Sequence, residues 1–522
     1  MTGGLHSDDR DQLAEHGIEP TEAERQLELL RRPGAAFRLL RPCTVGDGIR
    51  RLDEGEQRDA VAAWRAAVGH GTAARFVPAS GAATRMFRTL QPLLEEDPFP
   101  GPAELSRRAA AFDPPARDLE RLFRELPRLP FFDELAAVCA ARGTPLREVR
   151  ESRDGRRLLR ALLGAGGLGL GDLPKALLPF HRYPSGSRTA LEEHLREGSR
   201  YVADGNGRCR FHFTIAPDAR EAFLAEIAGA RQRLARDLDR HAEVELSEQH
   251  PHTDTLAITP EGEPFREDDG RLLLRPGGHG ALLANLGNLD ARWVLLKNVD
   301  NVRPEPAHEL VAHWQQVIGG LLVSLEERVA QHLRLLRSEA HDEAELVAAA
   351  RLLADELSVP GATAWADRPP GELRRLLRDQ LDRPLRVCAM VANRGEPGGG
   401  PFWVMRPGGE GSAQIVERDE VGDDRGQQDV LAAGTHFNPV QMAVGLRDAD
   451  GRPWDLPRFV DPRAVFITRK SHSSGRPLVA LERPGLWNGA MAGWNTVFVE
   501  VPAETFAPVK TVFDLLRPEH QV

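Results

Sequence analysis

The chain has 522 residues, of which 41% are hydrophobic and 28% charged, and its formal net charge is −10. This composition indicates a globular protein with a large core and, at this length, roughly two to four domains. The acidic balance argues against a nucleic-acid binder, and the absence of any apolar run of about 18 residues argues against a membrane span.

The first residues of the chain are polar and acidic, which is not typical of a signal peptide. The four cysteines have neither metal-ligand nor redox spacing. We therefore expect a cytoplasmic protein whose thiols are reduced and mostly buried.

Helix-period spacing of apolar residues predicts helices over 22–30 and 56–68, within a helical N-terminal region that spans 1–70. The short apolar run 75–79 then predicts a strand. Small residues follow it, so we expect a tight turn and a helix that begins near Thr84.

The next region, 71–305, has the pattern of an α/β core, with a mostly helical insertion at about 88–170. After the insertion the pattern predicts a helix over 189–202, a strand over 209–215 and a helix over 218–240. Alternating strand and helix signals of this kind favour a mostly parallel sheet.

Long amphipathic helices are predicted in the segment 306–380, and the segment 381–522 is richer in β-type residues and glycine. We interpret the latter as a β-rich region that completes the site of the core. The sequence has no internal repeat.

Lysine is rare in this arginine-rich chain. Only four of its 68 Lys and Arg residues are lysines, namely Lys175, Lys297, Lys470 and Lys510. A lysine that is kept where arginine is the default indicates a position that requires a compact ammonium group. We therefore predict that these lysines mark the working surface, although chance remains the alternative.

The turn after the first predicted strand has the composition of a phosphate-binding loop. Small residues at the start of a helix let backbone N–H groups approach a phosphate, and Arg85 could bind phosphate oxygens with two N–H groups. The alternative is a tight turn that needs small residues for packing. The backbone candidates are Ser80, Gly81, Ala82, Ala83 and Thr84.

Lys175 lies between Pro174 and Pro179, which stiffen the segment and fix where the lysine points. A lysine in a rigid loop is suited to holding a phosphate or a leaving pyrophosphate. The alternative is an ordinary surface lysine.

A second glycine-rich segment contains Gly277, Gly278, His279 and Gly280. Its glycines permit close approach of a base or a sugar to the backbone, and Gln249 upstream could read a base edge through its amide. The alternative for His279 is a histidine in a turn.

The apolar stretch that ends in Lys297 is followed by Asp300 and Asn301. The carboxyl end of a parallel strand is where α/β proteins place ligands, so Asp300 could hold Mg²⁺ through one carboxylate. The alternative for Asp300 is a helix cap or a turn former.

The C-terminal third adds amides, tryptophans and lysines in glycine-rich segments, which suit a sugar or a base. Core packing is the alternative for the tryptophans. The substrate-binding candidates are Lys297, Asn301, Asn438, Lys470, Asn488, Trp494, Asn495 and Lys510.

In their order along the chain, these segments resemble sugar-1-phosphate nucleotidyltransferases, especially the UDP-sugar pyrophosphorylase branch. Residues 80–85 resemble the Gly-Gly-x-Gly-Thr-Arg loop of that family, and Pro174–Lys175 resembles its Pro-Lys pair. Gln249 with Pro276 to Gly280 resembles its Gln and Gly-rich segment. Asp300–Asn301 resembles its Asp-Asn at a strand end.

Lys510 resembles a late lysine that contacts phosphate in the same branch. Over its whole length, the chain also resembles a bacterial family that is known only as a domain of unknown function. The resemblance implies a Rossmann-like (GT-A-type) nucleotidyltransferase fold of the α/β class with a mixed sheet.

Two departures from the family pattern are visible. Ser80 and Ala83 stand where the loop of the family has glycines, and about ninety residues separate Arg85 from Lys175, where the family has a short gap. A helical insertion whose two ends return to one cleft would explain the gap.

The leading hypothesis is nucleotidyl transfer between a nucleoside triphosphate and a phosphorylated small molecule, with Arg85, Lys175 and Asp300 as the catalytic residues. Mg²⁺ at Asp300 is the expected cofactor, and neither a nucleic acid nor a membrane is an expected partner. A GT-A-type glycosyltransferase and a non-catalytic nucleotide-binding protein are the alternatives, and the altered loop keeps the latter open.

Overall fold

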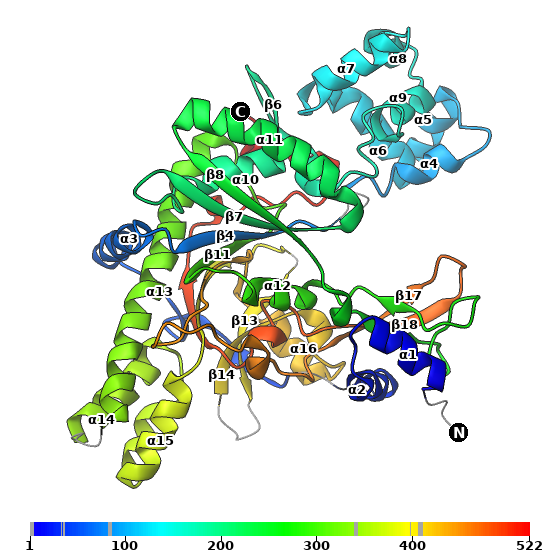
Figure 1. The fold of residues 1–522 in the computed structure, drawn as a ribbon. Helices are drawn as coiled ribbons and strands as arrows, with labels where there is room; N and C mark the ends of the chain where they lie inside the picture. Colours follow the sequence, from blue (N-terminus) through cyan, green and yellow to red (C-terminus); the bar gives the residue numbers. More distant parts are fainter. Residues whose placement is uncertain are drawn as a thin grey trace. The chain divides into compact units, whose positions relative to one another are not determined.

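The computed structural model describes residues 5–32, 34, 37–81, 86–338, 343–396, 398–405 and 411–522. The chain forms two compact units, and each unit is assembled from separate stretches of sequence (Figure 1). Unit 1 comprises Met1–Phe76, Ser247–Lys297 and His313–Ala503; unit 2 comprises Val77–Leu246, Asn298–Ala312 and Glu504–Val522.

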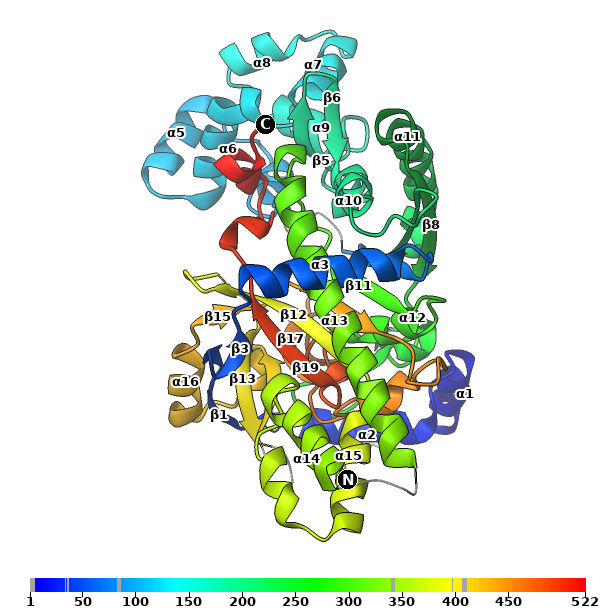
Figure 2. The same cartoon turned by 90° about the vertical axis from the view of Figure 1, so that its left-hand side faces the viewer.

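The main sheet of unit 1 is mixed. Its strands follow the order β2 (Thr44–Val45), β3 (Gly48–Arg50), β19 (Asn495–Glu500), β12 (Leu385–Ala392), β16 (Gln441–Gly445), β11 (Trp293–Lys297) and β4 (Ala73–Pro78). Most neighbours are parallel, including β12 and β19, which lie side by side in Figure 2. Only β16 runs antiparallel to both of its neighbours. The expected α/β class with a mixed sheet is confirmed.

Two smaller antiparallel sheets complete the strands of unit 1. One has the order β1 (Leu39–Pro42), β13 (Gly400–Met405) and β14 (Gly411–Val416). The other has the order β10 (Leu274–Arg275), β9 (Thr255–Ile258), β18 (Pro477–Glu482) and β17 (Phe466–Ser471). The short strand β15 (His436–Phe437) pairs with β12.

The helices of unit 1 include the two that apolar spacing predicts near the N-terminus. They are α1 (Ser7–Glu15), α2 (Pro20–Arg31), α3 (Glu54–Val68), α12 (Leu283–Gly287), α14 (Glu343–Arg351), α15 (Pro370–Leu381) and α16 (Arg425–Ala432), with most of α13 (His308–Arg337). Asp53 and Glu56 form a capping box at the start of α3. This helix packs on α13, where Gly319 and Gly320 face Trp64 and Ala60.

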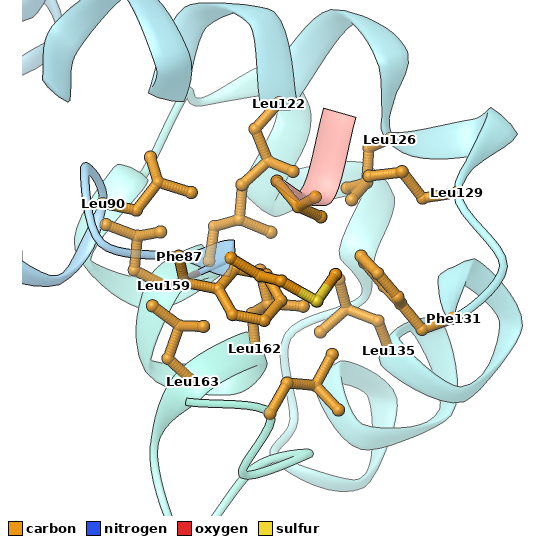
Figure 3. Packing of buried hydrophobic residues seen from close by; sticks show 14 of the residues in the cluster. Phe87, Leu90, Leu122, Leu126, Leu129, Phe131, Leu135, Leu159, Leu162 and Leu163 are labelled. Carbon is orange, nitrogen blue, oxygen red and sulfur yellow. The ribbon is translucent and has the colours of Figure 1, made fainter. Parts of the chain in front are cut away.

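Unit 2 contains a run of helices between residues 91 and 163, within the segment for which a helical insertion is predicted. The helices of this run are α4 (Gln91–Glu95), α5 (Pro102–Ala110), α6 (Pro114–Glu125), α7 (Phe132–Ala141), α8 (Leu146–Glu151) and α9 (Gly155–Leu163). Apolar residues from these helices form one core cluster (Figure 3). Val509, Phe513 and Leu516 from the C-terminal stretch belong to the same cluster.

The remaining elements of unit 2 follow the predicted alternation. They are β5 (Pro179–Tyr183), β6 (Gly186–Thr189), α10 (Ala190–Gly198), β7 (Arg208–Ile215), α11 (Arg220–Leu238) and β8 (His241–Glu248), which runs on into unit 1. Every residue of α10 is buried, including its charged residues. None of the helices in the described parts of the chain has the length and apolar character needed to cross a membrane.

Candidate functional site

In unit 2, Asp300 accepts hydrogen bonds from two of the four lysines of the chain. Lys175 Nζ donates to Asp300 Oδ2 at 3.1 Å, and Lys510 Nζ donates to the same oxygen at 2.9 Å. Lys175 and Asp300 are largely buried, with side-chain exposures of 12% and 10%, whereas the side chain of Lys510 is 56% exposed. We name these three residues the Asp300 cluster.

The charge of the Asp300 cluster follows from its ionisation. Burial raises the pKa of the Asp300 carboxyl, but the ammonium groups of Lys175 and Lys510 more than offset this effect, so the pKa lies below its ordinary value. Asp300 is therefore a carboxylate at neutral pH, and two ammonium groups surround it. The cluster carries an excess of one positive charge, which suits an anionic ligand.

The backbone of the C-terminal segment 504–522 holds Lys510 in place. The N–H of Val509 donates to the carbonyl of Asp300 at 3.0 Å, and the N–H of Ala507 donates to Asn301 Oδ1 at 3.2 Å. Lys175 Nζ also donates to the carbonyl of Val509 at 3.0 Å. Asn301, which we predicted as a ligand of the substrate, therefore binds the segment that carries Lys510.

Lys175 also contacts the start of the predicted phosphate loop. Its backbone N–H donates to the carbonyl of Gly81 at 3.2 Å. Ser80 and Gly81 are exposed, and among the described residues no atom lies within 4 Å of the position of a Cβ at Gly81. The predicted loop residues Ala82, Ala83, Thr84 and Arg85 lie outside the described residues.

The surroundings of Asp300 bear on its predicted role as a ligand of Mg²⁺. Two ammonium groups lie at hydrogen-bond distance from Oδ2, and they oppose a divalent cation on that oxygen. The described residues contain no group of three or more His, Cys, Asp or Glu side chains that could hold a metal ion. The Asp300 carboxylate, paired as it is with two ammonium groups, does not fit Mg²⁺, and Mg²⁺ binding by the chain stays a prediction.

The predicted base-binding segment lies in unit 1. An added Cβ at Gly277 would lie 2.4 Å from the carbonyl oxygen of Thr253, and one at Gly280 would lie 2.1 Å from that of Pro484. Gly278 has φ +73°, a conformation that favours glycine. Close packing accounts for Gly277 and Gly280, and backbone conformation accounts for Gly278.

His279 and Gln249 also have partners within unit 1. The His279 ring stacks on Trp487, with ring centroids 4.1 Å apart, and its Nδ1 accepts a hydrogen bond from the N–H of Leu486 at 3.0 Å. Desolvation lowers the pKa of His279 to about 4, so the ring is neutral at pH 7. Gln249 Nε2 donates to Asp254 Oδ1 at 3.1 Å.

The predicted substrate-binding amides of unit 1 are buried and bonded within the chain. Asn495 exchanges two hydrogen bonds with Gln380, at 2.8 and 2.9 Å. Asn438 Nδ2 donates to the carbonyl of Ala389, and its Oδ1 accepts from the N–H of Val440. Asn488 Nδ2 donates to Glu420 Oε2 at 3.0 Å. These contacts are structural, and a role in substrate binding stays a prediction.

The remaining predicted substrate residues of unit 1 lie in three different settings. Trp494 is 1% exposed and belongs to a core cluster that includes residues of the main sheet. Lys297 ends β11 and is 1% exposed. Lys470 lies on β17 and donates to Glu482 Oε1 at 2.7 Å. Lys175 and Lys510 share Asp300 as a partner.

Comparison with known proteins gives a family. The profile described as "Domain of unknown function (DUF4301)" matches residues 6–521. The chain belongs to this family. This result confirms the resemblance to a family known only as a domain of unknown function. No curated protein matches the sequence.

Solved structures similar to this DUF4301 chain include three from trypanosomatids. The uridine diphosphate N-acetylglucosamine pyrophosphorylase of Trypanosoma brucei shares 12% identity at a TM-score of 0.48, over 98% of this chain and 79% of the other. The UDP-glucose phosphorylase of the same organism shares 13% identity at a TM-score of 0.46, over 97% of this chain and 77% of the other. A UDP-glucose pyrophosphorylase mutant of Leishmania major shares 12% identity at a TM-score of 0.44, over 98% of this chain and 79% of the other.

Sequence reasoning missed one group of polar residues in this DUF4301 chain. His181, Glu193 and His520 form a buried hydrogen-bonded chain in unit 2. His181 lies two residues after Pro179, at the end of the predicted lysine segment, and this position was the available signal. Glu193 lies in a helix whose many charged residues are typical of a solvent-exposed helix, and His520 lies close to the end of the sequence. The sequence pattern therefore did not predict a role for either residue.

Proposed function

We propose that this chain is a nucleotidyltransferase that joins a nucleoside triphosphate and a sugar phosphate, or a similar phosphorylated small molecule, and releases pyrophosphate. One observation carries the proposal. Two lysines, 335 residues apart in the sequence, meet on one carboxylate beside the start of the predicted phosphate loop. The family resemblance implies a phosphate contact for Lys510, and the rigid loop of Lys175 suits the same role.

The proposed reaction requires positive charge from the protein but no covalent intermediate with it. A phosphate oxygen of the acceptor attacks the α-phosphorus, the bond from that phosphorus to the α–β bridging oxygen breaks, and pyrophosphate leaves with the electron pair. Because the attacking phosphate is already an anion, no general base is required. Stabilisation of charge and alignment of the two reactants provide most of the catalysis in such transfers.

Lys510 is the group best placed to stabilise the departing charge. Its Nζ makes one hydrogen bond in the described part of the chain, to Asp300, so two of its three N–H groups are left for phosphate oxygens. Its half-exposed side chain is accessible to a ligand. Lys175 is held by Asp300 and the carbonyl of Val509, and we assign it to a fixed phosphate contact.

The test is release of pyrophosphate from each nucleoside triphosphate in the presence of a panel of sugar phosphates. Lys175→Met and Lys510→Met should each lower kcat/KM by about 100-fold or more, since each removes a charge next to the transferred phosphate. The control is Arg517→Met, which removes an exposed cation that pairs with Asp514 on the same segment.

Three outcomes would contradict the proposal. Full activity in Lys175→Met would remove the assigned role of the Asp300 cluster. Release of a nucleoside diphosphate from nucleotide sugars, without pyrophosphate formation, would indicate a glycosyltransferase instead. Nucleotide binding without turnover of any pair would indicate a binding protein.

A further inference from the structure

A chain of hydrogen bonds lies buried in unit 2, away from solvent. His181 Nδ1 lies 3.0 Å from Glu193 Oε1, and His181 Nε2 lies 2.9 Å from His520 Nδ1. The side chains of His181 and Glu193 are 0% exposed, and His520 is 2% exposed. Because none of the three can reach a ligand, they cannot take part in the chemistry directly.

The direction of these hydrogen bonds follows from the ionisation of Glu193. Burial raises the pKa of this carboxyl, but the hydrogen bond from His181 and the neighbouring histidines offset the effect, so the pKa lies below its ordinary value. A carboxylate only accepts hydrogen bonds, so His181 Nδ1 carries a proton and donates. Tyr183 Oη donates to the same oxygen, Glu193 Oε1, at 2.7 Å and so holds the carboxylate in place.

His520 completes the chain as a neutral ring. Burial lowers the pKa of His520 to about 3, and the nearby His181 adds to this effect. One proton lies between His520 Nδ1 and His181 Nε2, and either ring nitrogen can donate it.

The two histidines belong to the two segments that supply the lysines of the Asp300 cluster. His181 follows Lys175 by six residues, through the 3-10 turn Lys175–Leu177 and β5. His520 follows Lys510 by ten residues, through the 3-10 turns Val512–Leu516 and Pro518–His520. The segments therefore meet twice, once at Asp300 and once at the histidine pair.

We propose that His181, Glu193 and His520 form a clasp that holds the C-terminal segment 504–522 and so positions Lys510 against Asp300 for an anionic ligand such as pyrophosphate. The part that concerns the ligand rests on the proposed function. The clasp itself is a claim about the segment alone. All three clasp residues are positioning residues, since they act through Lys510.

The variants exploit the two nitrogens of a histidine ring. An asparagine amide lies where Nδ1 lies, and a glutamine amide lies where Nε2 lies. His520→Leu removes the hydrogen bond to His181, whereas His520→Asn retains a polar group at Nδ1. His181→Gln retains the contact with His520, whereas His181→Asn retains only the contact with Glu193. Arg517→Met is the control.

Two measurements on the full-length protein separate the clasp from the function. The first is amide hydrogen exchange of residues 504–516, which should become about tenfold faster in His520→Leu and stay within about threefold of the wild type in His520→Asn. His181→Asn should match the faster exchange, and His181→Gln, which keeps the contact with His520 but loses the one with Glu193, should lie between the wild type and His520→Leu. Equal exchange in the wild type and His520→Leu would overturn the clasp.

The second measurement is the affinity for pyrophosphate by calorimetry. His520→Leu should weaken binding about tenfold, His520→Asn should restore most of it, and His520→Leu should add no further loss in a Lys510→Met background. Independent, additive losses would show that the clasp does not act through Lys510. If the wild type fails to bind pyrophosphate, the proposed function and the ligand part of the proposal fall, while the exchange data still decide the clasp.

Discussion

His279 shows how the surroundings of one residue set its chemistry. Its glycine-rich segment suggested a place for a base, yet the ring stacks on Trp487 and is kept neutral by desolvation. A neutral, stacked imidazole packs as an aromatic side chain would. Because His279 must stay neutral to remain buried, the free energy of unfolding depends on pH at this residue, with or without a bound ligand.

Replacing His279 should remove a specific pH dependence. The pKa of this histidine is about 4 in the folded chain, against 6.5 ordinarily. Since the unfolded chain binds the proton first, stability is present above pH 6.5 and is lost as the pH falls towards 4, by about 2–3 kcal/mol. His279→Phe retains the stack but cannot be protonated, and it also loses the hydrogen bond from the N–H of Leu486.

The measurement is the urea midpoint of unfolding at pH 7.5 and at pH 5. His279→Phe should be less stable than the wild type at pH 7.5, by about 1 kcal/mol, and the difference should narrow or reverse at pH 5. Parallel pH profiles for the two proteins would contradict the assigned ionisation.

At the scale of elements, the packing of α3 on α13 depends on two adjacent glycines. A Cβ at Gly320 would lie 1.7 Å from the carbonyl oxygen of Ala60, and one at Gly319 would lie 2.5 Å from the Trp64 ring. The first obstacle is backbone, which cannot rotate away as a side chain can. The two helices therefore approach as closely as they do only because no side chain stands between them.

Gly320→Ala should destabilise unit 1 by about 3 kcal/mol, because α3 and α13 must move apart to admit the methyl group. The matched control is Gly371→Ala on α15, where a Cβ meets no atom within 4 Å. The control should leave stability unchanged or raise it by up to about 1 kcal/mol. Thermal unfolding measures both, and equal effects of the two substitutions would contradict the packing argument.

The sequence predicts several helices and strands well because their apolar patterns are local. The helices at 22–30 and 56–68 and the strand at 209–215 lie within α2, α3 and β7. The antiparallel direction of β16 was not predictable, because a strand buried on both faces is an apolar run that carries no sign of direction.

The candidate site was predictable in its parts but not in its assembly. Lys175, Asp300 and Lys510 each stood out by residue type and neighbours, yet their contacts span 125 and 210 residues of sequence. Local patterns cannot show that Asn301 binds the C-terminal segment or that the amide of Asn495 binds Gln380. Those contacts depend on where the chain returns after long excursions.

At the scale of the whole molecule, the last nineteen residues return to unit 2 after the chain has completed unit 1. They bring apolar side chains into the core of the helical insertion, among them Val509, Phe513 and Leu516. The same stretch carries Lys510 and His520. The end of the chain thus contributes to the core, to the clasp and to the candidate site at once.

Ending the chain after Ala503 should therefore destabilise unit 2 selectively. Each buried apolar side chain that is lost removes roughly 1.5–3 kcal/mol of burial. Amides in α9 and α10 should exchange faster by hydrogen-exchange mass spectrometry, while amides in β12 and β19 of unit 1 should keep their protection. Uniform loss of protection in both units, or none in unit 2, would contradict this expectation.

The Asp300 cluster makes the protein its own competitor. The carboxylate of Asp300 accepts one hydrogen bond from each ammonium group and cancels one of their two positive charges. An incoming anion therefore meets the remaining N–H groups and a net charge of one positive. Asp300 thus sets how strongly the cluster attracts an anion.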